Sequence, residues 1–306
     1  MGPSFAAFDF FRQLMLPFVT SGSLRAARWR ERLDLNASTL MIVHVILSAN
    51  LAHIRPDDPG GAGFTVDDSR RRPVSLMSIA ESMNVPHETI RRQALDLQRR
   101  GILQKVGSGW IVSAALMTEA AGKALVDADA AALVAIVGDL ARLGSASAQD
   151  IDPAALWALP PDLVARLWND MNVVAAEAAC ELFGSMLDYS LFMAIIRINI
   201  EHKNADPERT SRHAAPDAIL ADRDRLPASL RALARVEKLP YPTVRRRVSA
   251  LVTRDLVEIS EGGAIVPARV LGNEFIMHRS VAYIHRIQKL LTDLKHLGSV
   301  TNSAGK

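Results

Sequence analysis

The side chains best suited to chemistry in this chain are arginines and threonines that occur in the same order at two places. The motif Thr-x-Arg-Arg stands at residues 89–92 and again, 154 residues later, at 243–246. A guanidinium group can donate two parallel hydrogen bonds to a guanine edge or a phosphate, and a threonine hydroxyl can donate to a phosphate. If the chain exposes these groups, they could recognise a nucleic acid.

Both motifs lie inside a longer internal repeat. Residues 75–114 (the first block) align without a gap on residues 229–268 (the second block), and 13 of the 40 pairs are identical. Upstream, with a shift of 149, Ala49–His53 faces Ile198–His202. Self-similarity over this length predicts that one structural unit was duplicated within the chain.

The first block reads as two helices separated by a tight turn. Ser75 is a good N-cap, and apolar residues follow it at helical spacing until Asn84-Val85-Pro86 breaks the pattern. A second helix begins near His87 and ends at Gly101, and its buried stripe is expected to be Ile90, Ala94 and Leu97. The second block repeats the pattern, with a turn at Leu239-Pro240 and a stripe of Val244, Val248 and Leu251.

Each pair of helices is followed by a predicted hairpin. In the first block, two short strands flank Gly107-Ser108-Gly109, and in the second block they flank Glu261-Gly262-Gly263. The order of helix, tight turn, helix and hairpin is the layout of a winged helix-turn-helix. The fold class we expect is mainly α, with two winged helix-turn-helix domains, each with a short β-hairpin wing, related by internal duplication on a helical scaffold.

Both blocks resemble the winged helices of bacterial regulators in the MarR, GntR and IclR families. The matching residues are Ile79-Ala80, Thr89 to Arg92 and Gly101-Ile102-Leu103 in the first block, with Leu233-Ala234, Thr243 to Arg246 and Leu256-Val257 in the second. The resemblance implies that the second helix enters the major groove of double-stranded DNA and that the wing touches the backbone. The chain looks like two fused MarR-type subunits.

The expected DNA contacts come from the second helix of each block and from the first wing. The candidates are His87, Thr89, Arg91, Arg92, Arg99, Lys105, Tyr241, Thr243, Arg245, Arg246 and Arg247. Glu261 at the tip of the second wing would repel phosphate. A solvated basic helix face is the alternative interpretation, but the repetition of Thr-x-Arg-Arg near both helix starts favours DNA.

Charge is distributed unevenly along the sequence. The net charge is +3, but residues 145–202 carry eight acids against two arginines, which leaves +9 for the rest of the chain. Arginines account for 29 of the 36 basic residues, and arginine suits phosphate and guanine better than lysine does. The run Arg70–Arg72 is either a phosphate clamp or a solvated loop, and Arg25, Arg28, Arg30 and Arg32 are equally ambiguous.

Other chemistry is sparse. The eight histidines include no HxxxH pair, and Cys180 is the only cysteine, so neither a zinc site nor an intrachain disulfide is expected. The glycines at 60–63 precede no Lys-Ser/Thr pair, and no G-x-S-x-G motif occurs. We therefore expect no enzymatic activity, no metal and no cofactor.

The repeat predicts the organisation of the chain. The expected parts are an N-terminal helical extension (1–37), repeat 1 (38–145, winged helix 70–115), an acidic helical linker or scaffold (146–186), repeat 2 (187–299, winged helix 225–269) and a disordered tail (300–306). The helix at 275–297 carries Met277, Val281, Ile284, Gln288 and Leu291, with Ile287 and Leu294 beside them. This stripe predicts a homodimer seam, although core packing would produce the same pattern.

The function we expect is that of a sequence-specific double-stranded DNA-binding transcriptional regulator, cytoplasmic and associated with the nucleoid. The longest apolar run, Leu40–Ile54, is too short to cross a membrane, and Asp9 and Arg12 interrupt the N-terminal apolar segment. A small-molecule effector between the scaffold helices is compatible with this expectation. The alternatives are a plasmid- or phage-type replication initiator and a winged-helix protein-interaction module of a chromosome-organising complex.

Overall fold

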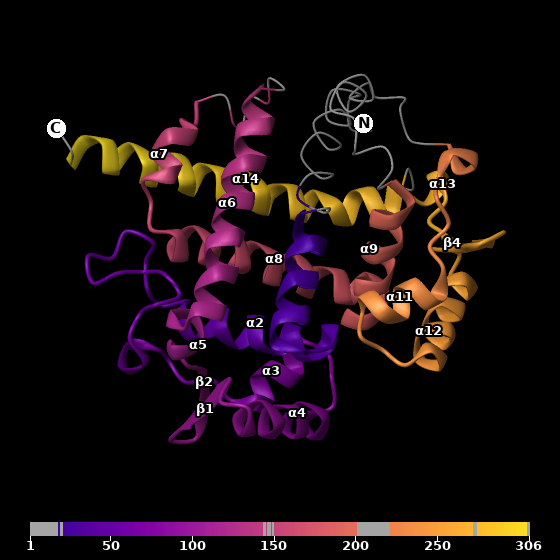
Figure 1. The fold of residues 1–306 in the computed structure, drawn as a ribbon, viewed down its shortest axis with the longest axis horizontal. Helices are drawn as coiled ribbons and strands as arrows, with labels where there is room; N and C mark the ends of the chain where they lie inside the picture. The colour runs from indigo at the N-terminus through magenta and orange to yellow at the C-terminus, as the bar shows by residue number, and fades with distance from the viewer. Residues whose placement is uncertain are drawn as a thin grey trace. The chain divides into compact units, whose positions relative to one another are not determined.

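The structure is a computed structural model that describes residues 18, 21–142, 145, 148, 150–200, 221–271 and 274–304. Side chains are described for all of these except 175, 177–181, 274–282 and 300–304. The described part is mainly helical, with two small antiparallel sheets, as expected from the sequence (Figure 1). The chain divides into two compact units, each built from two separate segments.

The first-block unit comprises residues 38–180 and 286–306. Its elements are α2 (Ala37–Leu51), the 3₁₀ helix η1 (Asp68–Arg70), α3 (Leu76–Ser82), α4 (His87–Arg99), β1 (Leu103–Val106), β2 (Gly109–Val112), α5 (Ala115–Thr118), α6 (Ala120–Arg142), α7 (Pro153–Trp157) and most of α8 (Pro161–Phe183). Residues 286–304 of α14 (Glu274–Ala304) belong to it as well.

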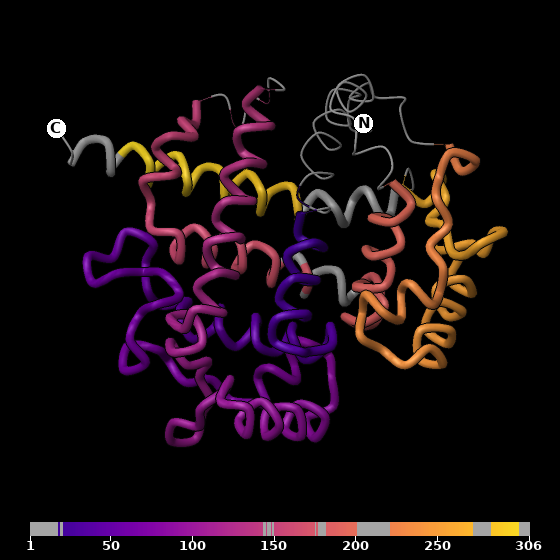
Figure 2. The backbone as a smooth tube through the Cα atoms, in the orientation of Figure 1, coloured from indigo at the N-terminus to yellow at the C-terminus, as the bar shows by residue number. Residues whose placement is uncertain are grey.

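The second-block unit comprises residues 1–37 and 181–285. Its elements are the helix Ser21–Leu33, α9 (Met186–Ile200), the 3₁₀ helix η3 (Asp222–Asp224), α11 (Leu230–Val236), α12 (Tyr241–Thr253), β3 (Glu258–Ser260), β4 (Gly263–Ile265), α13 (Ala268–Leu271) and the first part of α14. Among the described elements, the order from α9 to α14 is the same as the order from α2 to α6, and the two stretches can be followed by colour in Figure 2.

The helix caps and turns in both blocks form where the sequence predicts them. Ser75 accepts a hydrogen bond from the backbone N–H of Ser78 at 3.1 Å and caps α3, and Ser229 caps α11 through Ala232 at the same distance. After each of these helices the chain turns through a residue with positive φ, Asn84 (50°) or Lys238 (51°). The second helix of each block, α4 or α12, then starts directly after Pro86 or Pro240.

Each block ends in a two-stranded antiparallel hairpin. Leu103 pairs with Val112 in the first hairpin, and Glu258 pairs with Ile265 in the second. A single residue upstream of each block adds a further bridge, Val74 to Trp110 and Ala228 to Ala264. These bridges connect each hairpin to the segment that leads into its block.

Two buried asparagines connect the helix before each block to the hairpin. Asn50 in α2 donates to the carbonyls of Arg72 (2.8 Å) and Trp110 (3.1 Å), and its Oδ1 accepts from the N–H of Val112 (2.9 Å). Asn199 in α9 makes the corresponding bonds to Leu226 O (2.7 Å), Ala264 O (3.1 Å) and Val266 N (2.9 Å). The side chain of each asparagine thus fixes its own hairpin in the same way.

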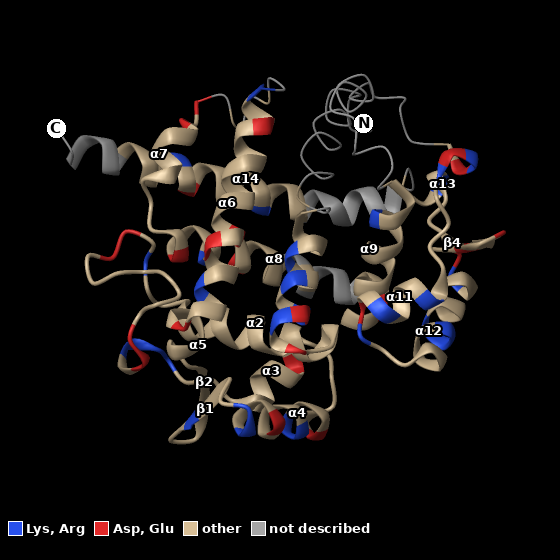
Figure 3. Ribbon diagram, viewed as in Figure 1, with Lys and Arg blue, Asp and Glu red and all other residues tan. Residues whose placement is uncertain are grey.

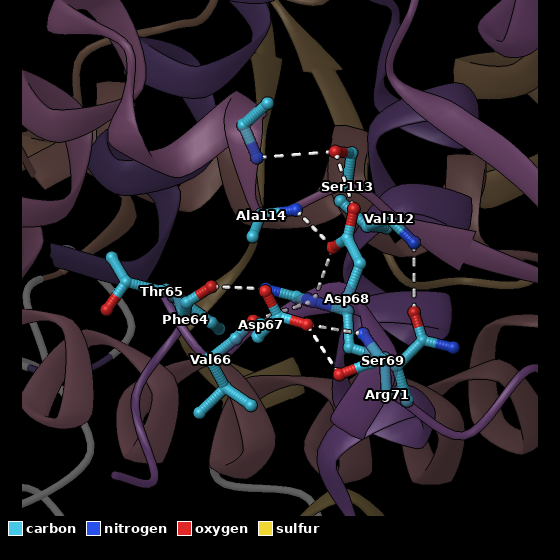
Figure 4. A network of polar contacts seen from close by, with 12 residues as sticks. Phe64, Thr65, Val66, Asp67, Asp68, Ser69, Arg71, Val112, Ser113 and Ala114 are labelled. Atoms are coloured by element: carbon cyan, nitrogen blue, oxygen red, sulfur yellow. Dashed lines mark hydrogen bonds and ion pairs between the residues drawn. The ribbon is translucent and has the colours of Figure 1, made fainter.

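An aspartate upstream of each block binds the last residue of that block. Asp68 accepts from the backbone N–H of Ala114 (2.7 Å) and from the hydroxyl of Ser113 (3.0 Å), and it pairs with Arg71 (3.1 Å), as Figure 4 shows. In the other unit, Asp222 accepts from the N–H of Ala268 at 2.7 Å and pairs with Arg225 at 3.2 Å. Both carboxylates occupy the first turn of a 3₁₀ helix.

The segment predicted as an acidic linker contributes to the core of the first-block unit. Trp168 in α8 is fully buried, and Asn169 donates to the carbonyl of His44 in α2 at 3.2 Å. Arg166, also buried, donates to the carbonyls of Leu51 (2.8 Å) and Ile54 (2.7 Å), which lie at and just beyond the end of α2. Helix α8 is therefore a packed element whose side chains donate to backbone carbonyls of α2 and of the turn that follows it.

The predicted disordered tail also differs in the structure. Helix α14 continues to Ala304, so most of the segment 300–306 is helical.

Across the described residues, no single helix is long and apolar enough to cross a membrane. Only two consecutive helices taken together, Ser21–Leu33 and Ala37–Leu51, reach that length and composition.

Candidate nucleic-acid interface

Helix α4 has one apolar face and one charged face. Ile90, Ala94 and Leu97 are completely buried, as their spacing predicts, and anchor the helix in its block. The opposite face is exposed and carries Arg91 and Arg92. Figure 3 shows basic and acidic residues alternating along this helix.

Helix α12 is built in the same way but carries a different charge pattern. Val244 and Leu251 are completely buried, and Val248 is nearly so. Arg245 and Arg246 are exposed on the opposite face, with basic residues visible on α12 in Figure 3 and no acidic residue between its bounds. This face is therefore more strongly positive than the face of α4.

The predicted site residues divide into two groups by exposure. The exposed residues are His87, Arg91, Arg92, Arg99 and Lys105 in the first block and Tyr241, Arg245 and Arg246 in the second. The partly buried residues are Thr89, Thr243 and Arg247. Within each block, the predicted residues at the start of the second helix lie within its first two turns.

Two exposed arginines of α4 are paired with acids one turn away. Arg91 donates from Nε and Nη2 to the two carboxylate oxygens of Glu88, at 2.8 and 2.7 Å. The hydrogen bond from Arg91 lowers the pKa of Glu88 below its usual value, and the same bond raises the pKa of Arg91. Arg99 donates a single hydrogen bond to Asp96 at 2.9 Å.

The guanidinium groups of α12 are used differently. Arg247 approaches Asp188 of α9 at 3.4 Å, with a side chain that is 35% exposed. Within the described ranges, no hydrogen bond or ion pair joins the side chain of Arg245 or Arg246 to another residue, and the same holds for the side chain of Arg92 in α4. These three cations have their donors available for a ligand.

The two hairpins have opposite charge. Lys105 in β1 is exposed and lies next to Val106, which is 44% exposed. In the second hairpin, Glu258 is exposed and shares Arg269 with Asp255, at 2.6 and 2.8 Å. The second hairpin thus carries Glu258 in addition to the predicted Glu261, while one arginine offsets part of this negative charge.

The arginine run before the first block is mainly structural. Arg71 is buried, donates to the carbonyls of Phe64 and Val66, and pairs with Asp68. Arg70 pairs with Asp58 at 2.9 Å. The interpretation of this run as a phosphate clamp is therefore not supported for Arg70 and Arg71, because both guanidinium groups bind carbonyl and carboxylate oxygens inside the chain.

The N-terminal arginines are also partly structural. Arg30 is buried and donates to Glu237, a buried residue at the end of α11, at 2.8 Å. Burial lowers the pKa of Arg30, and the charge of Glu237 opposes this effect. Arg25 is buried with its guanidinium 5.5 Å from the ring centre of Trp29. These two side chains therefore lie in the interior of the second-block unit and are not available to a ligand.

The stripe predicted as a dimer seam on α14 is largely buried within the chain. Ile287 and Leu294 are fully buried, Leu291 is nearly so, and Ile284 is 9% exposed. Core packing, the alternative interpretation of the same spacing, accounts for these residues. The side chains of Met277 and Val281 lie outside the described residues.

Four polar residues that hold the blocks in place have no role predicted from the sequence: Asn50, Asn199, Asp68 and Asp222. A signal was present for the asparagines, because they align when the chain is shifted by 149 residues.

Among the described residues there is no group of three or more His, Cys, Asp or Glu side chains that could hold a metal ion. Comparison with known protein families, with curated proteins and with solved structures gives no significant match to this chain.

Proposed function

We propose that the chain is a sequence-specific transcriptional regulator that binds double-stranded DNA through two winged helices, one in each block. The observation that carries the proposal is the exposed Arg-Arg pair in the first half of both α4 and α12. In a helix-turn-helix protein, the N-terminal residues of the second helix contact the base edges in the major groove. Arginine is the side chain that most often makes specific contacts with guanine.

The surroundings of this pair support the same proposal. Each pair stands on a helix whose opposite face is buried, after a short helix and a turn through a residue of positive φ. A two-stranded hairpin follows each helix and is fixed by a buried asparagine. The matching hydrogen bonds of Asn50 and Asn199 support the internal duplication that the sequence predicts.

Binding of selected DNA by the purified chain tests the proposal. A duplex enriched from a random pool would be titrated with the wild type, with Arg91→Ala/Arg92→Ala and with Arg245→Ala/Arg246→Ala, using fluorescence anisotropy. We expect each double variant to bind the selected duplex about tenfold or more weakly, because a bidentate contact with a base contributes about 1–3 kcal/mol of discrimination.

The control removes the same number of charges from another surface. Arg55→Ala/Arg142→Ala changes two side chains that are 81% and 79% exposed and lie outside both blocks. We expect this variant to bind nearly as well as the wild type, and all variants to keep the far-UV circular dichroism of the wild type. Unchanged affinity in both Arg-Arg variants would refute the proposed role of α4 and α12.

A further inference from the structure

The ion pair between Glu88 and Arg91 fixes the orientation of one guanidinium on the proposed DNA-binding surface. Glu88 lies in the first turn of α4 and Arg91 one turn later. Both oxygens of the carboxylate accept a hydrogen bond, one from Nε and one from Nη2, at 2.8 and 2.7 Å. This bidentate contact holds the guanidinium plane in one position relative to the helix.

The contact leaves one edge of the guanidinium available. Arginine has five N–H donors, and Glu88 uses the Nε–H and one hydrogen of Nη2. The second hydrogen of Nη2 and the two hydrogens of Nη1 form the remaining edge. That edge has the spacing of two parallel donors, which matches O6 and N7 of guanine in the major groove.

Stability does not account for this pair. The Glu88 side chain is 71% exposed and that of Arg91 is 50% exposed, and ion pairs this exposed contribute little to folding. The second block gives an internal comparison, since Pro242 occupies the position of Glu88 while Arg245 retains the position of Arg91. Arg91 in α4 thus has a carboxylate one turn before it, whereas Arg245 at the same position of α12 has none.

We propose that Glu88 is a specificity-determining residue that positions Arg91 to read one guanine, whereas Arg245 binds with less selectivity. The inference rests on the proposed function, since it requires α4 to lie in the major groove. Glu88 also repels phosphate, so Arg91 gains less from a nonspecific contact than an unpaired arginine would. Specificity therefore rises for two reasons. Glu88 orients Arg91 toward the guanine, and it makes nonspecific contacts with phosphate less favourable.

Selection of duplexes from a random pool by the wild type and by Glu88→Gln tests this inference. We expect Glu88→Gln to bind unrelated DNA more tightly and to lose about tenfold of the preference for guanine at a single position. Asp96→Asn is the matched control, because it removes the same charge from the same helix and releases Arg99 instead. It should raise nonspecific affinity and leave the guanine preference at the position read by Arg91 unchanged.

A reciprocal variant adds the carboxylate to the other helix. Pro242→Glu places an acid in the first turn of α12, one turn before Arg245, and should create a preference for one base in the sites bound by the second block. If the wild type selects a site and Glu88→Gln retains the full guanine preference, the inference is wrong and the proposed function still stands. If the wild type binds no duplex DNA, the proposed function itself is wrong.

Discussion

Arg166 and Arg92 illustrate two opposite uses of the same side chain. Arg166 is buried, donates to the carbonyls of Leu51 and Ile54, and forms an ion pair with Asp170, so its charge is offset inside the chain. Arg92 is exposed on α4, and its side chain forms no hydrogen bond within the described residues. A high arginine content therefore supports DNA binding only after the structural arginines are set aside.

The asparagines that fix the hairpins lead to a prediction about stability. Asn50→Ala removes three hydrogen bonds and leaves buried backbone groups of Trp110 and Val112 with fewer partners. We expect the free energy of unfolding of the first-block unit to fall by about 2–3 kcal/mol, because an unpaired buried donor or acceptor costs about 1–3 kcal/mol. Urea denaturation followed by circular dichroism measures this change.

Two further variants show whether the effect is specific. Asn199→Ala should destabilise the second-block unit by a similar amount, since its three hydrogen bonds have the same geometry. Gln104→Ala, on an exposed position of β1, should change the free energy of unfolding by no more than about 0.5 kcal/mol. An Asn50→Ala protein that unfolds at the wild-type urea concentration would contradict the role assigned to this side chain.

At the scale of elements, the hairpins differ more than the helices do. Lys105 in β1 is exposed, while its counterpart in the second block is Ile259, which is 59% exposed and next to Glu258. If the first hairpin follows the DNA backbone, Lys105→Ala should weaken binding equally for all sequences. The slope of log affinity against log salt should decrease by about 0.9, the value for one phosphate contact.

The matched control for Lys105 is another lysine on a helix outside both blocks. Lys123 in α6 is 65% exposed, and its replacement by alanine should leave the salt slope unchanged. Equal slopes for Lys105→Ala and the wild type would mean that the first hairpin does not contact phosphate. A flat salt response of the wild type would favour the protein-interaction alternative.

Local signals were sufficient to predict the elements of each block. The cap at Ser75, the break before Pro86 and the positive φ of Gly101 (73°) all depend on residues close in sequence. The partners of Arg71 and Arg166 could not be predicted, because they are backbone carbonyls brought near by the fold. Sequence shows that a side chain can donate, but only packing decides which buried oxygen needs a donor.

The apolar stripe of α14 shows a related ambiguity. A helical period predicts that one face is buried, but it contains no information on whether the partner is the same chain or a second copy. Ile287 and Leu294 are buried within one chain. The spacing thus predicts a buried face, which core packing explains for these residues, and the homodimer stays a prediction.

At the scale of the whole molecule, the two units do not follow the predicted boundaries. Each unit combines two segments that are distant in sequence, residues 38–180 with 286–306 and residues 1–37 with 181–285. Helix α14 begins in one unit and ends in the other. The internal repeat alone predicts that each copy is one continuous segment. It does not predict that residues 1–37 belong to the unit of the second block and residues 286–306 to the unit of the first.

Two blocks in one polypeptide predict a composite DNA site. We expect the selected duplex to contain two half-sites about 10 base pairs apart, or a multiple of that spacing, as for the two subunits of a dimeric helix-turn-helix regulator. The half-sites should be similar but not identical, because the blocks differ at positions that the proposed function places in the groove. The differing pairs are His87/Tyr241, Glu88/Pro242, Gln93/Arg247 and Arg99/Thr253.

Footprints of single-block variants test this composite site. Arg91→Ala/Arg92→Ala should lose protection of one half-site, and Arg245→Ala/Arg246→Ala should lose protection of the other, because each variant removes the cations of one helix only. Light scattering of the complex measures how many chains bind each duplex, and one chain per pair of half-sites is expected. If both variants protect the same single compact site as the wild type, the two blocks do not read DNA together.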